Sequence, residues 1–225
     1  MLKSIKTSVI ALILVTTAIY AKGQKVVSSG TITYGITYGF TAEQKAQIDE
    51  SMLPKESKVD FAGNLSRLKL QLGPAMVTVI DDAVAHAGLL LIDIPIAQKQ
   101  YAAKRTTEFL AKEKGDTKYS NFKATGVKKM IAGYNAEQYT YTDQNGAAYE
   151  LWTSKDVQLS PGARMSGFEE VPGTLLQFTA VQNGAPSTLT VKSIKEAKVG
   201  PFSIVIPSGY EEKTMDEINA MRGGQ

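Results

Sequence analysis

Residues 133–152 read GYNAEQYTYTDQNGAAYELW, and no other stretch says as much about the fold. This stretch holds four of the ten tyrosines, the only tryptophan and an Asn-Gly pair at positions 145 and 146. Asn-Gly between two runs rich in aromatic residues is a strong signal for a β-hairpin turn. We therefore expect two antiparallel strands, with Gly133 and Asn145-Gly146 at strand ends or turns.

The aromatic side chains of this hairpin divide between two faces, because successive residues of a strand point to opposite sides of a sheet. Tyr139 and Tyr141 share one face, as do Tyr149 and Leu151 on the next strand. Trp152 falls on the face opposite Leu151. We expect Trp152 to be largely buried against a core or an apolar cavity.

Strand patterns continue on both sides of the hairpin. Residues 65–72, LSRLKLQL, alternate leucines with Lys69 and Gln71, as a half-buried strand does. Residues 89–92, LLLI, are apolar at every position, which predicts a strand covered at least in part on both faces. FSIVIP at 202–207 is expected to form the last strand.

Two segments carry the pattern of a helix start in which two side chains cap each other. Thr41 with Gln44 predicts a helix over 42–52, and Thr214 with Glu217 predicts a C-terminal helix at about 214–222.

A further helix is expected at about 104–113, and residues 159–169 are expected to form a loop or a short helix. The whole chain gives about nine or ten strands, joined by hairpin turns. This order favours the α+β class, with one antiparallel-sheet domain.

The N-terminus has the layout of a secretory signal peptide. Lys3 and Lys6 precede an apolar run at 8–17, which is shorter than the roughly 20 residues of a membrane-spanning helix. Cleavage after Ala21 and cleavage after Gly23 both fit the small residues that follow the run. We expect residues 1–23 to be removed and residues 24–225 to form a periplasmic or secreted domain without a lipid anchor.

The composition excludes several classes of function. The full chain has 25 basic and 22 acidic residues; removal of residues 1–23 takes away Lys3, Lys6 and Lys22 and leaves 22 of each. No polybasic stretch then points to nucleic acid, and no transmembrane segment is expected after signal removal. The absence of cysteine excludes disulfides, thiol nucleophiles and a lipid-modified cysteine.

The sequence offers little for catalysis or metal binding. His86 is the only histidine, and neither a two-histidine nor a cysteine zinc site can be built. No nucleophile-elbow, Walker or dinucleotide motif occurs. Asp143-Gln-Asn145-Gly146 begins like a calcium loop, but its glycine comes too early and the closing Glu is missing. We expect no enzyme, no catalytic residue, no metal and no cofactor.

Four segments, in this order, resemble a known family: GNLSRLKLQLG (63–73), LLLIDIPIAQKQYAA (89–103), GVKKMIAGYNAEQYTYTDQNGAAYELWTSKDV (126–157) and FSIVIPSGYEE (202–212). They are similar to exported bacterial proteins of unknown function related to the LolA/LolB-like lipoprotein-sorting superfamily. The resemblance implies a strongly curved antiparallel β-sheet, a LolA-like half-barrel, with two or three helices covering one side.

The resemblance also implies an apolar cavity that holds acyl chains. Our first hypothesis is a periplasmic or secreted carrier for an apolar ligand, which is a lipid, an acyl chain or a lipoprotein anchor. Leu70, Trp152 and Phe178 are the candidate lining residues, and all three would also serve as ordinary core. The alternative is an envelope protein-interaction or structural module without a small-molecule ligand.

Overall fold

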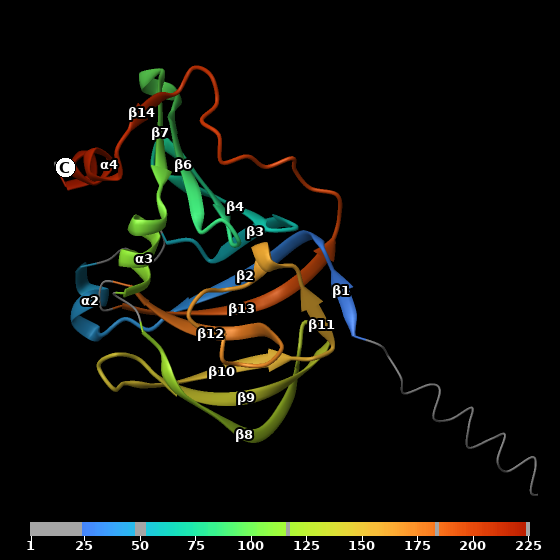
Figure 1. Ribbon diagram of the computed structural model, residues 1–225. Coiled ribbons are helices and arrows are strands. Elements are labelled where there is room, and N and C mark those ends of the chain that lie inside the picture. Colours follow the sequence, from blue (N-terminus) through green and yellow to red (C-terminus); the bar gives the residue numbers. More distant parts are fainter. Residues whose placement is uncertain (1–23, 48–52, 116–117, 183–184, 224–225) are drawn as a thin grey trace, which may run out of the picture.

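One twelve-stranded sheet organises the chain. The computed structural model describes residues 24–47, 53–115, 118–182 and 185–223 (Figure 1). The strands are β1 (Lys25–Val27), β2 (Ser29–Tyr38), β3 (Glu56–Ala62), β4 (Leu65–Leu72), β5 (Ala75–Asp82), β6 (Ala87–Ile94), β7 (Lys99–Arg105), β8 (Ser120–Ile131), β9 (Tyr134–Thr142), β10 (Ala148–Ser154), β11 (Val157–Leu159), β12 (Thr174–Gln182), β13 (Ala185–Glu196) and β14 (Glu211–Lys213). The helices are α2 (Ala42–Gln47), α3 (Thr107–Gly115) and α4 (Met215–Gly223), with 3-10 turns η2 (Pro95–Ala97) and η3 (Pro161–Ala163).

The strand order of the large sheet is β14-β7-β6-β5-β4-β3-β2-β13-β12-β10-β9-β8. Its neighbours are antiparallel except β14, which runs parallel to β7. A second sheet pairs β1 with β11, also in parallel. The prediction of a purely antiparallel sheet is therefore wrong at these two pairs. The fourteen described strands, three of them only three residues long, exceed the predicted nine or ten. The α+β class is confirmed, while no sheet is closed within the described ranges.

The hairpin at 133–152 forms as predicted. Tyr149 lies opposite Tyr141, and Leu151 lies opposite Tyr139. The Asp143 carboxylate accepts the backbone N–H groups of Asn145 and Ala147, each at 2.9 Å, and so closes the turn. Gly133 and Gly146 both adopt φ values near +80°, the left-handed region that favours glycine.

Strands β6 and β7 are covered on both faces, as the apolar run at 89–92 predicts. On one side Tyr101 and Ala103 pack under Ile218 of α4; we call this side of the whole sheet the α4 face. On the other side Leu89 and Leu91 pack under residues 197–210, which we call the strap, and this side is the strap face.

The predicted strand at 202–207 is wrong, because this segment crosses the strap face instead of joining an edge (Figure 1). Phe202, Ile204 and Ile206 pack on the core of β5 and β6, and the Arg67 guanidinium lies 4.7 Å above the Phe202 ring. Alternating apolar residues thus fit a segment with one buried face, even though the segment pairs with no strand.

Both predicted helix starts are confirmed. At α2 the Thr41 N–H donates to the Gln44 amide oxygen at 2.9 Å, and at α4 the Thr214 N–H donates to Glu217 at 2.7 Å. The far end of the predicted helix 42–52 lies outside the described residues. Helix α3 begins later than predicted because β7 continues to Arg105, and η3 is the short helix expected within 159–169.

We expect the packing of α4 against β7 to depend on one side chain. Ile218 is 2% exposed and Met221, on the same helix, is 43% exposed. Ile218→Ala should therefore cost about 2–4 kcal/mol of packing, which would release α4 from β7. Limited proteolysis followed by mass spectrometry should detect early cleavage in α4. Met221→Ala is the matched control, and equal protection of α4 in both variants would contradict this account.

Candidate functional site

The α4 face forms one continuous apolar surface from β7 to β3. Directly opposite residues share a face, and the pairs that carry the surface are Tyr101–Ile92, Ile92–Val77, Val77–Leu70, Ala103–Leu90, Leu90–Val79, Val79–Leu68 and Leu68–Val59. The surface continues into β2, because Val59 lies opposite Ile32.

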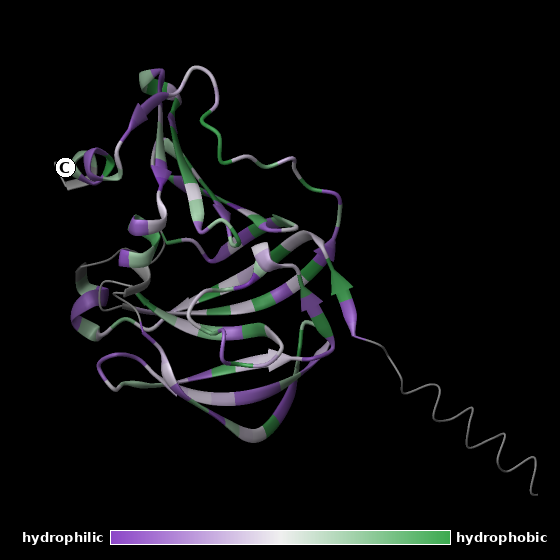
Figure 2. Cartoon of the chain, in the orientation of Figure 1, coloured by the Kyte–Doolittle hydropathy of each residue, from purple (hydrophilic) through white to green (hydrophobic). Residues whose placement is uncertain are grey.

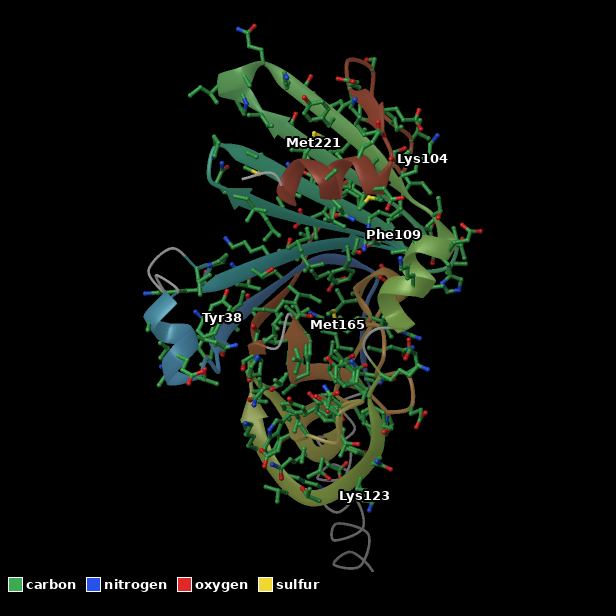
Figure 3. The ribbon with its side chains drawn as sticks, turned by 90° about the vertical axis from the view of Figure 1, so that its left-hand side faces the viewer. Tyr38, Lys104, Phe109, Lys123, Met165 and Met221 are labelled. Carbon is green, nitrogen blue, oxygen red and sulfur yellow. The ribbon has the colours of Figure 1, made fainter. Side chains whose placement is uncertain are left out.

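The middle of this face is only half covered. Val59, Leu68, Leu70, Val77 and Val79 are half-buried, and Leu72 is 47% exposed. Helix α4 packs on β7, and η3 contacts β3 and β4. Figure 3 looks onto this side, where α4 crosses the upper strands and Phe109 and Met165 lie below it. We call these five half-buried side chains with Leu72 the apolar strip.

Further along the same face, aromatic rings fill the space above β2, β9 and β12. Phe168, from the loop after η3, has its ring centre 5.4 Å from that of Phe178 and 5.5 Å from that of Tyr141. Tyr119 stacks on Phe168 at 4.8 Å. We call Tyr119, Tyr141, Phe168 and Phe178 the aromatic cluster. Its ring contacts hold the loop at 160–173 against the sheet. Figure 2 shows hydrophobic and hydrophilic residues alternating along the long strands beneath it.

The Tyr141 hydroxyl closes a gap between strands. It donates to the Thr179 carbonyl at 2.6 Å and accepts the Thr179 N–H at 3.1 Å. β10 pairs with β12 only over Trp152–Ser154, so Thr179 lies beyond that ladder. Burial is the main cause that raises the pKa of Tyr141 well above its ordinary value, so the hydroxyl stays protonated.

A pocket of about 390 Å³ lies between the loop at 160–173 and the sheet. This volume is within the range of small-molecule sites. Its buried lining residues are Tyr34, Val157, Leu159, Ala163, Phe168 and Val171. Its exposed lining residues are Gln24, Gln158, Arg164, Met165, Glu169 and Gly173. The pocket thus has an apolar floor and a polar mouth.

Tyr34 places a hydroxyl at this floor. It is 3% exposed, and its ring meets Phe178 edge-on at 6.3 Å between ring centres. No other described residue forms a hydrogen bond with its hydroxyl. Burial raises the pKa of Tyr34 far above its ordinary value, so this hydroxyl remains a hydrogen-bond donor.

The structure separates the three residues predicted to line a cavity. Leu70 lies in the apolar strip, and Phe178 lies on the same face within the aromatic cluster. Trp152 is 5% exposed, as predicted, but it points to the opposite face: it lies across from Gln138 and Gln177, under the Lys129 ammonium at 3.9 Å from its ring centre. Only Leu70 and Phe178 therefore share a face.

Tyr34 and the loop at 160–173 were not predicted as pocket residues. Tyr34 sits between Ile32 and Ile36 on one alternating face, so a polar-tipped side chain in an apolar row was the available signal. The loop gave no such signal, because its contacts with the sheet are distant in sequence.

The remaining titratable and apolar groups of the described residues lie outside the apolar strip and the pocket. His86 lies exposed in the β5–β6 connection, as expected of a loop histidine. Within the described ranges no three His, Cys, Asp or Glu side chains gather as metal ligands. No helix in that part of the chain is long and apolar enough to span a membrane.

In comparisons with known proteins, no family model matches the chain and no curated protein matches it significantly.

Tyr141→Phe should lower the free energy of unfolding by about 1–3 kcal/mol, because the Thr179 N–H and carbonyl lose a buried partner. Denaturant unfolding followed by circular dichroism measures the change. Tyr139→Phe, on the same strand and face, is the matched control, since its hydroxyl has no hydrogen-bond partner among the described residues. Equal stability of the two variants would contradict the bridging role.

Stability should also fall at alkaline pH. Tyrosine in the unfolded chain ionises near pH 10, whereas buried Tyr34 stays protonated because burial raises its pKa. The stability that Tyr34 contributes is therefore complete below about pH 10 and is lost as pH rises, by roughly 1.4 kcal/mol at pH 11. Urea unfolding of wild type and Tyr34→Phe at pH 8 and pH 11 should show a smaller loss in the variant. Parallel losses would contradict the assignment.

Proposed function

We propose that the protein binds an apolar ligand, a lipid or acyl chain, on the α4 face and carries it outside the cytoplasm. The observation that supports this proposal most directly is the half-exposed apolar strip beside the 390 Å³ pocket. The apolar strip and the pocket adjoin. Val59 of the strip lies opposite Ile32, and Tyr34 of the pocket lies two residues from Ile32 on the same face. A site of this kind suits a ligand buried mostly by hydrophobic side chains.

We also propose that the large sheet forms a half-barrel of the LolA-like kind. Its support is an open sheet in one linear strand order, with α2, α3 and α4 along one side of the molecule (Figure 1). Relationship to the lipoprotein-sorting superfamily is part of the same proposal, and it rests on the four segments that resemble that family.

Export by a signal peptide completes the proposal. Residues 1–23, which lie outside the described ranges, carry the charged and apolar regions of such a peptide. A periplasmic or secreted location, without a lipid anchor, would make a lipoprotein anchor or a membrane lipid available as the ligand.

The sheet edges favour ligand binding over strand addition as the main mode of recognition. Edge strand β8 carries Lys123, Lys128 and Lys129 and two register irregularities, and edge strand β14 has only three residues. Lysines, irregular pairing and shortness are the usual means of blocking an edge against a further strand.

The first experiment is native mass spectrometry of the protein purified from a bacterial host, together with thermal unfolding in the presence of fatty acids and phospholipids. We expect co-purified lipid and a rise in melting temperature of about 5 °C at a hundredfold excess over Kd. A clean apo mass with no thermal shift would overturn the proposal, and capture of a defined envelope protein would then favour the interaction module.

The apolar strip should be needed for binding. Leu70→Glu places a charge among half-buried apolar side chains, and we expect it to weaken lipid binding at least tenfold. Gln71→Glu is the matched control, because the neighbouring exposed residue points to the other face. Equal retention of co-purified lipid by both variants, at comparable melting temperatures, would place the ligand elsewhere.

A further inference from the structure

The Tyr34 side chain in the pocket under the loop at 160–173 carries a hydroxyl that forms no hydrogen bond with any described residue. We propose that this pocket recognises an acyl ester, with the Tyr34 hydroxyl donating a hydrogen bond to the ester carbonyl oxygen. This inference rests on the proposed function and names the polar group that the apolar site would select.

The Tyr34 hydroxyl lacks a hydrogen-bond partner among the described residues. A buried tyrosine hydroxyl normally finds a hydrogen-bond partner. Tyr141, in the same aromatic cluster, bonds both polar groups of the Thr179 backbone. Tyr34 is 97% buried by residue, since only 3% is exposed, yet no described residue bonds its hydroxyl. Among the described residues, the fully buried side-chain polar atom without a partner is Arg67 Nε. The Tyr34 hydroxyl also has no partner but is not such an atom, so its oxygen is not fully enclosed and borders open space.

The sheet and a neighbouring ring fix the orientation of the Tyr34 side chain. Tyr34 lines the pocket from β2, a strand paired on both sides, and its ring is held edge-on against Phe178. The donor is thus placed by a rigid sheet and a fixed ring, so little conformational entropy is lost when a ligand accepts its hydrogen bond.

The lining of the pocket favours a neutral hydrogen-bond acceptor. Val157, Leu159 and Phe168 make the floor apolar, and a charged carboxylate costs far more to desolvate there than a neutral ester does. At the mouth, Arg164 and Glu169 carry opposite charges and both are exposed, so the entrance does not select a charged head. A neutral carbonyl on an acyl chain fits both regions.

The test compares ligands of equal chain length: methyl laurate, laurate and dodecane. Affinities come from competition against the fluorescent apolar dye diphenylhexatriene, with wild type and Tyr34→Phe. We expect wild type to bind methyl laurate about tenfold more tightly than dodecane, the worth of one hydrogen bond in an apolar site. Tyr34→Phe keeps the ring and should lose that preference, while its affinity for dodecane changes less than about twofold.

Tyr139→Phe is the matched control, because it removes a hydroxyl from the same face of the sheet at a residue that does not line the pocket. It should keep the preference for the ester. An unchanged preference in Tyr34→Phe, or no preference in wild type, would overturn the inference and leave the proposed function standing. Tighter binding of laurate than of its ester would overturn the choice of a neutral head. No binding of any of the three ligands by wild type would overturn both proposals.

Discussion

The hydrogen bonds between the Tyr141 hydroxyl and the Thr179 backbone hold together the half of the sheet on which the site is built. β10 and β12 share only a short ladder, which is irregular at Trp152, so the strands on either side need another connection. Tyr141 supplies it from β9, and its ring at the same time supports Phe168 at 5.5 Å. The position of the loop at 160–173, and with it the shape of the pocket, follows from where this one ring and its hydroxyl sit.

The two ends of the described chain return to strands that are far away in sequence. β2 pairs with β13, β1 pairs with β11, and β14 pairs with β7 after the strap has crossed the sheet. Contacts of this separation form slowly, because the loop entropy must be lost before the contact is gained. Most of the chain must therefore be present before the sheet is complete, and the local hairpins are the parts able to form first.

Local rules predicted the parts of this structure that depend on neighbours in sequence. Alternation and an Asn-Gly turn gave the 133–152 hairpin, and two capping pairs gave the starts of α2 and α4. The predicted strand at 202–207, within the strap, was wrong. Alternating apolar residues with one buried face occur both in a segment that joins a sheet and in a segment that lies across it. The parallel pairing of β14 with β7 could not be predicted from the sequence either, since it depends on the direction in which the strap approaches β7.

The candidate site was predicted less well than the fold. Leu70, Trp152 and Phe178 were predicted to line one cavity. Leu70 and Phe178 lie on a common face and Trp152 on the other, because a strand position alone does not say which of two covered faces holds a cavity. Tyr34 shows what such a site asks of the chain. Phenylalanine at position 34 would keep the contact with Phe178 and would leave no hydroxyl without a partner, so selection for stability alone would favour it. Related chains that have lost the ligand should drift to phenylalanine at this position, and chains that keep the ligand should keep tyrosine.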